Sequence, residues 1–163
     1  MKTKIKALMI FAFLIFLPQL PAFSQNAAGA YGGATFSFSS EENLSADAGL
    51  NYILDINAYH LSLSGELSFT PQKIKKVGLT ADFWFLYPRI GASAFHWYAG
   101  AGTGAYVLFT GDFSFAFSVR AVLGLEFFPV SRLGVFVQAV AEPSFSKDFC
   151  FCLPVSVGVR WWF

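Results

Sequence analysis

The sequence predicts an all-β protein: an eight-stranded antiparallel up-and-down transmembrane β-barrel. Three observations lead to this fold class. Apolar and polar residues alternate with a period of two through nearly all of the chain after residue 24. Of the 163 residues, 55% are hydrophobic and only 13% are charged, about half the charged share of an average soluble protein. The alternating segments number eight, and an even number lets an up-and-down barrel close with both termini at one end.

The N-terminal residues have the pattern of a secretory signal peptide. A positively charged head precedes an apolar run over residues 7–17, and Ala22 and Ser24 supply the small residues of a cleavage site. The run is too short for a membrane anchor, which needs about 20 apolar residues. The predicted organisation is a signal peptide over residues 1–24 followed by one barrel domain over residues 25–163.

The first three predicted strands set the pattern. The first, over residues 28–38, is the weakest because it is rich in glycine and alanine. The second and third cover residues 50–56 and 59–69. In the third, Leu61 and Leu63 lie on an apolar face, and every charged residue falls on the opposite face. Such strict alternation is typical of a strand with one polar and one apolar side.

The other five strands follow the same rule. The fourth, fifth and sixth are expected over residues 77–87, 95–109 and 113–127, and the seventh and eighth over residues 133–142 and 155–163. Ten steps of about 3.3 Å, tilted by about 40°, give a height of about 25 Å, which matches the apolar band of a membrane barrel. Because lipid offers the backbone no hydrogen bonds, the strands must close on themselves and leave no free edge.

Two alternatives fit less well. The uncharged stretch between Arg89 and Asp112 is long enough for a helical span, but Gly100, Gly102 and Gly104 recur with the period of a strand. A soluble barrel of lipocalin type would turn its apolar face inward. The interior of eight strands holds one small ligand and could not accommodate that many apolar side chains.

The connections alternate between the two ends of the predicted barrel, and those at one end are slightly longer. The longer set is taken as outward, which places both termini at the inner end. The outward connections are expected over residues 39–47, 70–76, 110–112 and 145–153, and the inward ones near Asn57 and over residues 88–94 and 129–132. Aromatic residues collect at both rims, as girdle residues do. The inner set is Tyr59, Tyr87, Trp97, Phe127, Trp161 and Phe163, and the outer set is Phe36, Phe69, Phe109 and Phe113.

The last eight residues carry a family resemblance. Ser156, Gly158, Trp161 and Phe163 match the pattern polar-x-Gly-x-x-aromatic-x-Phe at the C-terminus. This ending resembles the assembly signal by which outer-membrane barrel proteins reach their insertion machinery. The chain as a whole resembles the small outer-membrane barrels of the OmpA, OmpX and OmpW kind, and no motif selects a subfamily.

The resemblance implies a location and a set of partners. The protein is expected in the outer membrane of a diderm bacterium, with both termini in the periplasm. Its partners would be outer-membrane lipid, lipopolysaccharide and the barrel-assembly machinery, with no nucleic acid, and it would be a monomer. Lys73, Lys75 and Lys76 are expected at a basic loop tip, either solvated or in contact with lipopolysaccharide phosphate.

Six charged residues are expected to face the lumen, namely Glu66, Asp82, Arg120, Glu126, Glu142 and Arg160. Eight strands leave an interior just wide enough for side chains to fill it, and buried charges are costly unless they are paired. We therefore expect these groups to form the core of a plug, with the excess carboxylates hydrated or protonated. The expected role is structural or one of surface interaction. The alternative is a narrow channel for small or apolar solutes.

Neither catalysis nor a cofactor is expected. His60 and His96 fall at the inner ends of their strands, without a nucleophile, base and orienting acid that converge. The Gly100–Gly104 glycines lack the following helix of a dinucleotide site. Cys150 and Cys152, expected in the last outward loop, could form a local disulfide or stay free. Two thiolates fall short of the four ligands of a structural zinc site, so no metal is expected.

Overall fold

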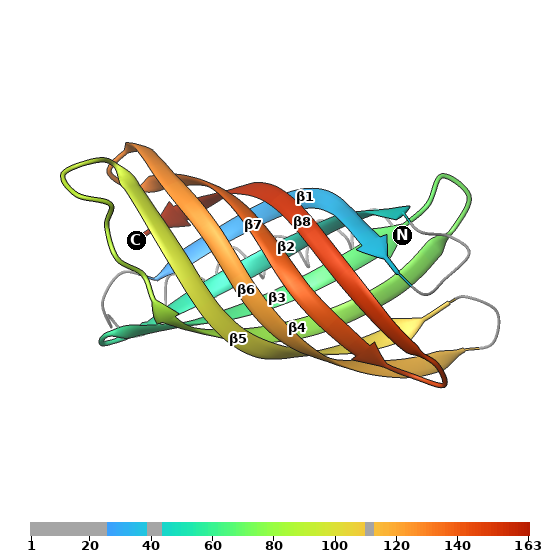
Figure 1. The fold of residues 1–163 in the computed structure, drawn as a ribbon. Coiled ribbons are helices and arrows are strands. Elements are labelled where there is room, and N and C mark those ends of the chain that lie inside the picture. The colour runs from blue at the N-terminus through green and yellow to red at the C-terminus, as the bar shows by residue number, and fades with distance from the viewer. Residues whose placement is uncertain (1–25, 39–43, 110–112) are drawn as a thin grey trace, which may run out of the picture.

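The computed structural model describes residues 26–38, 44–109 and 113–163 and confirms the predicted fold class (Figure 1). Every strand pairs antiparallel with its sequence neighbours, and β1 pairs with β8 to close the barrel. The predicted signal peptide lies outside the described residues. No helix long and apolar enough to cross a membrane occurs in the described part of the chain. The strands are β1 (Ala27–Ser37), β2 (Leu44–Ile56), β3 (Tyr59–Phe69), β4 (Ile74–Leu86), β5 (Phe95–Leu108), β6 (Ser114–Val130), β7 (Leu133–Phe145) and β8 (Phe149–Trp162).

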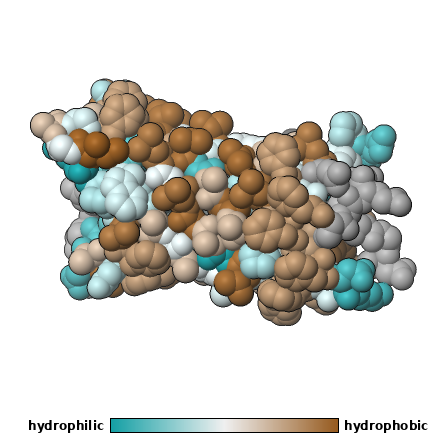
Figure 2. Space-filling view, in the orientation of Figure 1, coloured by the Kyte–Doolittle hydropathy of each residue, from teal (hydrophilic) through white to brown (hydrophobic). Residues whose placement is uncertain are grey.

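The alternation places apolar side chains outside and charged side chains inside. Phe83 on β4 and Phe115 on β6 are 41% and 63% exposed on the outer wall, whereas Asp82 on β4 and Arg120 on β6 are 4% and 3% exposed. Figure 2 shows hydrophobic side chains along most of the wall, and hydrophilic ones mainly toward the two ends. An apolar surface of this extent is unsuited to water. The wall therefore matches the prediction of a lipid-facing exterior.

Several strands are longer than predicted. β2 already begins at Leu44 and β8 at Phe149, so parts of the expected loops 39–47 and 145–153 belong to paired strands. Continued pairing satisfies backbone N–H and C=O groups that a loop would leave to solvent. The longest connection among the inward set is now residues 87–94, longer than any outward one. The predicted contrast in loop length was therefore wrong, and it gives no support to the orientation.

A register shift changes which way residues point at the end of β4. Between Trp84 and Leu86 the β4–β5 ladder has a bulge, and both Phe85 and Leu86 are exposed on the outer wall. The extra residue turns Tyr87 toward the lumen, where its hydroxyl donates a hydrogen bond to Glu126 at 2.8 Å. The prediction that Tyr87 belongs to the lipid-facing aromatic girdle at the inner rim was wrong, because a bulge reverses the period-two pattern beyond it.

Large inward aromatic side chains lie directly opposite glycines on the neighbouring strands. These pairs are Tyr31 with Gly49, Trp84 with Gly100, Tyr98 with Gly124, Tyr106 with Gly78, and Phe136 with Gly158. A Cβ atom added at any of these five glycines would overlap the opposing side chain. The missing side chains thus make room for rings that fill the lumen, and the rings cover backbone that the glycines would leave bare.

Candidate functional site

The charged side chains of the lumen form two clusters at different depths. The Arg120 cluster comprises Glu66, Lys76, Asp82, Tyr106, Arg120 and Glu142. The Arg160 cluster comprises Tyr87, Tyr98, Glu126, Gln138, Arg160 and Trp162. All six residues predicted to face the lumen belong to one cluster or the other. Each cluster draws its members from strands on different sides of the barrel.

Arg120, on β6, joins three strands across the lumen. Its Nε lies 2.9 Å from Asp82 Oδ1 on β4, and its Nη1 lies 2.8 Å from Glu142 Oε2 on β7. The same Nη1 donates to the Tyr106 hydroxyl at 2.9 Å. The planar guanidinium carries five N–H donors, so one arginine can serve several acceptors. Arg120 therefore links β6 to β4, β5 and β7 through its side chain.

Lys76 is a lumen residue that the sequence reasoning missed. It was expected at a basic loop tip, either solvated or in contact with lipopolysaccharide phosphate, but β4 begins at Ile74 and Lys76 pairs with Ser68 on β3. Its Nζ lies 3.4 Å from Glu66 Oε1 and 3.8 Å from Glu142 Oε1, and 4.2 Å from the centre of the Tyr106 ring. The same alternation that defined the rest of β4 could have shown this. The carboxylate excess expected from the six predicted residues is reduced by this third cation.

Arg160, on β8, is the centre of the second cluster and is completely enclosed. Its Nη1 lies 3.1 Å from Glu126 Oε2, and its guanidinium carbon lies 3.5 Å from the centre of the Phe136 ring. Glu126 also accepts hydrogen bonds from Tyr87 and from the Trp162 indole N–H at 3.0 Å. The carboxylate is paired with a cation and hydrogen-bonded on both oxygens, which is what a buried charge requires.

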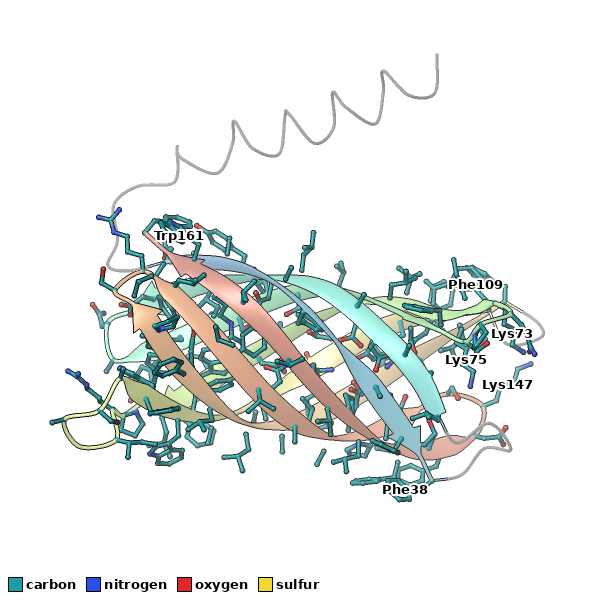
Figure 3. All side chains as sticks on the ribbon, turned by 90° about the horizontal axis from the view of Figure 1, so that it is seen from above. Phe38, Lys73, Lys75, Phe109, Lys147 and Trp161 are labelled. Carbon is teal, nitrogen blue, oxygen red and sulfur yellow. The ribbon has the colours of Figure 1, made fainter. Side chains whose placement is uncertain are left out.

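One end of the barrel opens into a cavity that we call the lysine mouth, of about 430 Å³. Figure 3 labels Lys73, Lys75 and Lys147 at this end. Hydroxyl groups, lysines and two thiols line the cavity, among them Ser37, Ser45, Lys73, Lys75, Lys76, Cys150 and Cys152. The prediction that the cysteines lie in a loop was wrong: both are residues of β8, and their Sγ atoms lie 3.5 Å apart without a bond.

The other end opens into the histidine mouth, a cavity of about 820 Å³ near the C-terminus. His60 and His96 pack against the Tyr87 ring at centroid distances of 4.7 Å and 4.9 Å. Burial and the nearby Glu126 raise the pKa of Tyr87, which lies just beyond the end of β4. The Nδ1 atom of each histidine is buried without a hydrogen-bond partner. The contacts of both imidazole rings with Tyr87 are aromatic packing.

The residues of the C-terminal pattern divide between the two faces of β8. Ser156 is buried in the lumen and Gly158 lies under the Phe136 ring, whereas Trp161 and Phe163 are exposed on the outer wall. Figure 3 labels Trp161 at the end opposite the lysines. The Phe163 N–H donates to the Asn26 carbonyl at 2.9 Å. This backbone hydrogen bond extends the pairing between β1 and β8 by one residue beyond each strand.

Wall and lumen together define a class of molecule: a closed eight-stranded barrel with an apolar exterior and a charged, aromatic interior. No protein-family model matches the sequence, and no curated protein matches it. Neisserial surface protein A superposes with a TM-score of 0.71 at 13% identity, over 86% of this chain and all of that one.

Two further solved structures give the same result. The N-terminal β-barrel domain of Pseudomonas aeruginosa OprF has a TM-score of 0.61 at 12% identity, over 85% of this chain and 97% of its own. Ail, the attachment invasion locus protein of Yersinia pestis, has a TM-score of 0.52 at 15% identity, over 85% and 98%. The chain therefore has the fold of the small outer-membrane β-barrels. At these identities the likeness concerns the fold alone.

Proposed function

We propose that the chain is an integral outer-membrane β-barrel protein with a structural or surface-interaction role, and that side chains close its lumen. The apolar wall and the fold shared with small outer-membrane barrels support the location. The role is non-enzymatic, because neither mouth brings an oriented nucleophile and base together among the described residues.

The observation that carries the closed lumen is the pair of arginine clusters. Arg120 connects β6 to β4 and β7, and Arg160 connects β8 to β6 at a different depth. A solute that crossed the barrel would have to displace both clusters. Breaking one buried ion pair costs about 3–5 kcal/mol. The resting protein should therefore pass no ions.

Planar-bilayer recording of the refolded full chain tests this proposal. We expect no stepwise conductance from the unaltered protein. We expect openings in a variant that carries both Arg120→Ala and Arg160→Ala, and none in the Arg132→Ala control, whose side chain is exposed on the turn between β6 and β7. Stepwise conductance from the unaltered protein would contradict the closed lumen.

The second candidate function is a narrow channel for small or apolar solutes. It is favoured by the cavities at the two mouths, about 820 Å³ and about 430 Å³. Between them lie the two arginine clusters and buried rings such as Trp84 and Phe136. Conductance that rises when solute is added, in the same recordings, would favour this function over the structural role.

Orientation and partners belong to the same proposal. Both termini would face the periplasm, so the lysine mouth would face outward and bring Lys73 and Lys75 to the level of lipopolysaccharide phosphates. A peptide tag inserted between Ser146 and Asp148, in the β7–β8 turn, should then be labelled by antibody on intact cells. Labelling only after the outer membrane is permeabilised would reverse the orientation.

A surface-interaction role has its own test. Residues 38–43 and 146–148 connect strands at the lysine mouth, and each can be replaced by a minimal turn without shortening a strand. Loss of cell or ligand binding after either replacement would support the role. Unchanged binding in both variants would leave the structural role. Neither replacement touches the arginine clusters, so a folding defect is not expected.

A further inference from the structure

The two cysteines form a preorganised pair at the lysine mouth. The chain contains only these two. Cys150 and Cys152 are two residues apart on β8, so their side chains point to the same face of the strand. Their Sγ atoms lie 3.5 Å apart, and both residues line the cavity of about 430 Å³. The thiols are therefore adjacent to each other and within reach of a small solute.

The backbone holds the pair in a geometry that disfavours a disulfide. Cα atoms two residues apart in an extended strand are separated by about 6.6 Å, close to the upper limit of about 6.8 Å for a disulfide. Cys152 pairs with Ser37 on β1 and Glu142 on β7, and Cys150 pairs with Ser144. Shortening the sulfur separation from 3.5 Å to about 2.05 Å would strain a strand that is paired on both sides.

The same separation suits two ligands of one metal ion. Two thiolates that bind a three-coordinate ion at about 2.3 Å each, with about 120° between the two bonds, are about 4.0 Å apart, so the observed 3.5 Å has to widen by about 0.5 Å. We propose that Cys150 and Cys152 form a binding site for a soft monovalent metal ion, Cu(I) or Ag(I). Thiolates are the ligands that such ions prefer. Ser37, with its Oγ 3.8 Å from Cys152 Sγ, is the nearest further donor.

Coordination number separates this ion class from zinc. No group of three or more His, Cys, Asp or Glu side chains suited to a metal occurs among the described residues. A structural zinc ion takes four protein ligands, which this mouth does not offer. A soft monovalent ion is satisfied by two thiolates, with Ser37 or solvent as a weak third ligand.

Charge also favours a monovalent ion. On binding, each thiol releases one proton to solvent and forms one sulfur–metal bond, so no electron is transferred. Two thiolates and one monovalent cation carry a net charge of −1. Lys73, Lys75 and Lys76 line the same cavity and complement that charge. The charge of the Lys76 ammonium is balanced by Glu66 and Glu142. Lys76 therefore does not repel a metal cation from the two thiols.

Anaerobic titration of the reduced, detergent-folded full chain with Cu(I), against a competing chelator, tests the proposal. We expect one ion per chain and an X-ray absorption spectrum with two sulfur neighbours. Cys150→Ser and Cys152→Ser should each weaken binding by more than the roughly 10–100-fold that loss of an outer-shell partner costs. The control Ser146→Ala, in the same cavity, should bind like the unaltered chain.

Three results would overturn the site. The first is a single-cysteine variant that binds as tightly as the unaltered chain, and the second is an unaltered chain that binds no Cu(I) while both thiols react. The third is a Cys150–Cys152 disulfide in all protein isolated from membranes under non-reducing conditions. Gel mobility with and without boiling shows that each variant is folded, so a loss of binding can be assigned to the ligand. None of these results depends on whether the lumen conducts.

Discussion

At the scale of the residue, the lumen depends on the choice of arginine. Arg120 reaches acceptors on β4 and β7 together with the Tyr106 hydroxyl, because its guanidinium presents donors in several directions within one plane. Arg160 adds a flat face, which lies against the Phe136 ring. A lysine at either position would supply a point charge without this reach or this face. Lys76, by contrast, needs only two carboxylates.

Arg120→Ala should be strongly destabilising. Asp82, Glu66 and Glu142 would lose their shared cation while remaining buried, and breaking a buried pair in this way costs about 3–5 kcal/mol. Urea unfolding of the liposome-inserted protein, followed by tryptophan fluorescence, measures the loss. Arg132→Ala, on an exposed turn, serves as the matched control. A free energy of unfolding within about 0.5 kcal/mol of the unaltered protein, the usual range for a surface substitution, would show that the cluster contributes little.

The paired glycines lead to a second prediction at this scale. Gly124→Ala would bring a Cβ atom into the Tyr98 ring, whereas Gly65→Ala on the outer wall would meet only Leu79 at 3.8 Å. Tyr98 would have to shift and weaken its hydrogen bond to Gln138, now 3.0 Å. We expect a cost of about 1–3 kcal/mol for Gly124→Ala and almost none for Gly65→Ala. Near-ultraviolet circular dichroism should change only in the former. Equal effects would mean that the lumen repacks freely.

At the scale of the element, alternation decides the faces within a strand and fails at its ends. Along β6, every second side chain from Phe115 to Phe127 is exposed, and all the intervening residues are buried. At the end of β4 the bulge reverses the pattern and brings Tyr87 inward. Period-two patterning assumes an unbroken ladder, and a sequence by itself does not mark where one partner strand supplies an extra residue.

The outward face of β6 should show a depth profile. Leu123, near the middle of the strand, and Phe113, just before its start, are both exposed on the wall. Leu123→Arg should cost about 2–4 kcal/mol in a bilayer, and Phe113→Arg about 0–1 kcal/mol, because the penalty for arginine falls toward the interface. Unfolding in liposomes compares the two. A larger cost at Phe113 than at Leu123 would mean that the wall does not face lipid as proposed.

At the scale of the whole molecule, the barrel is closed by pairing between its first and last strands. β1 pairs with β8 along nearly its whole length, and the Phe163 N–H donates to the Asn26 carbonyl. That hydrogen bond uses only backbone atoms, so it does not need the half-exposed Phe163 side chain, whose ring centre lies 6.3 Å from that of Tyr52. Recognition by the assembly machinery stays the predicted role of Phe163, as the last residue of the C-terminal pattern.

Phe163→Ala should therefore separate assembly from stability. In cells, less protein should reach the heat-modifiable folded form, because the assembly signal is weakened. After refolding into detergent, the free energy of unfolding should differ little from that of the unaltered chain. Phe127→Ala removes another exposed phenylalanine without touching the pattern and should leave assembly in cells unchanged. Equal losses of assembly for both variants would remove the support for a signal at Phe163.

The sequence by itself determined the class of fold, because a two-residue period and a shortage of charge follow from which solvent each face of a strand meets. It also identified six lumen residues, since inward charges in a narrow barrel lie on the polar face of each strand. Only the tertiary structure decided which of them meet. The joining of Arg120 to Asp82 and Glu142, the inward turn of Tyr87, and the placing of the thiols in β8 depend on strand length, bulges and register. These are set by pairing between strands, which no local pattern records.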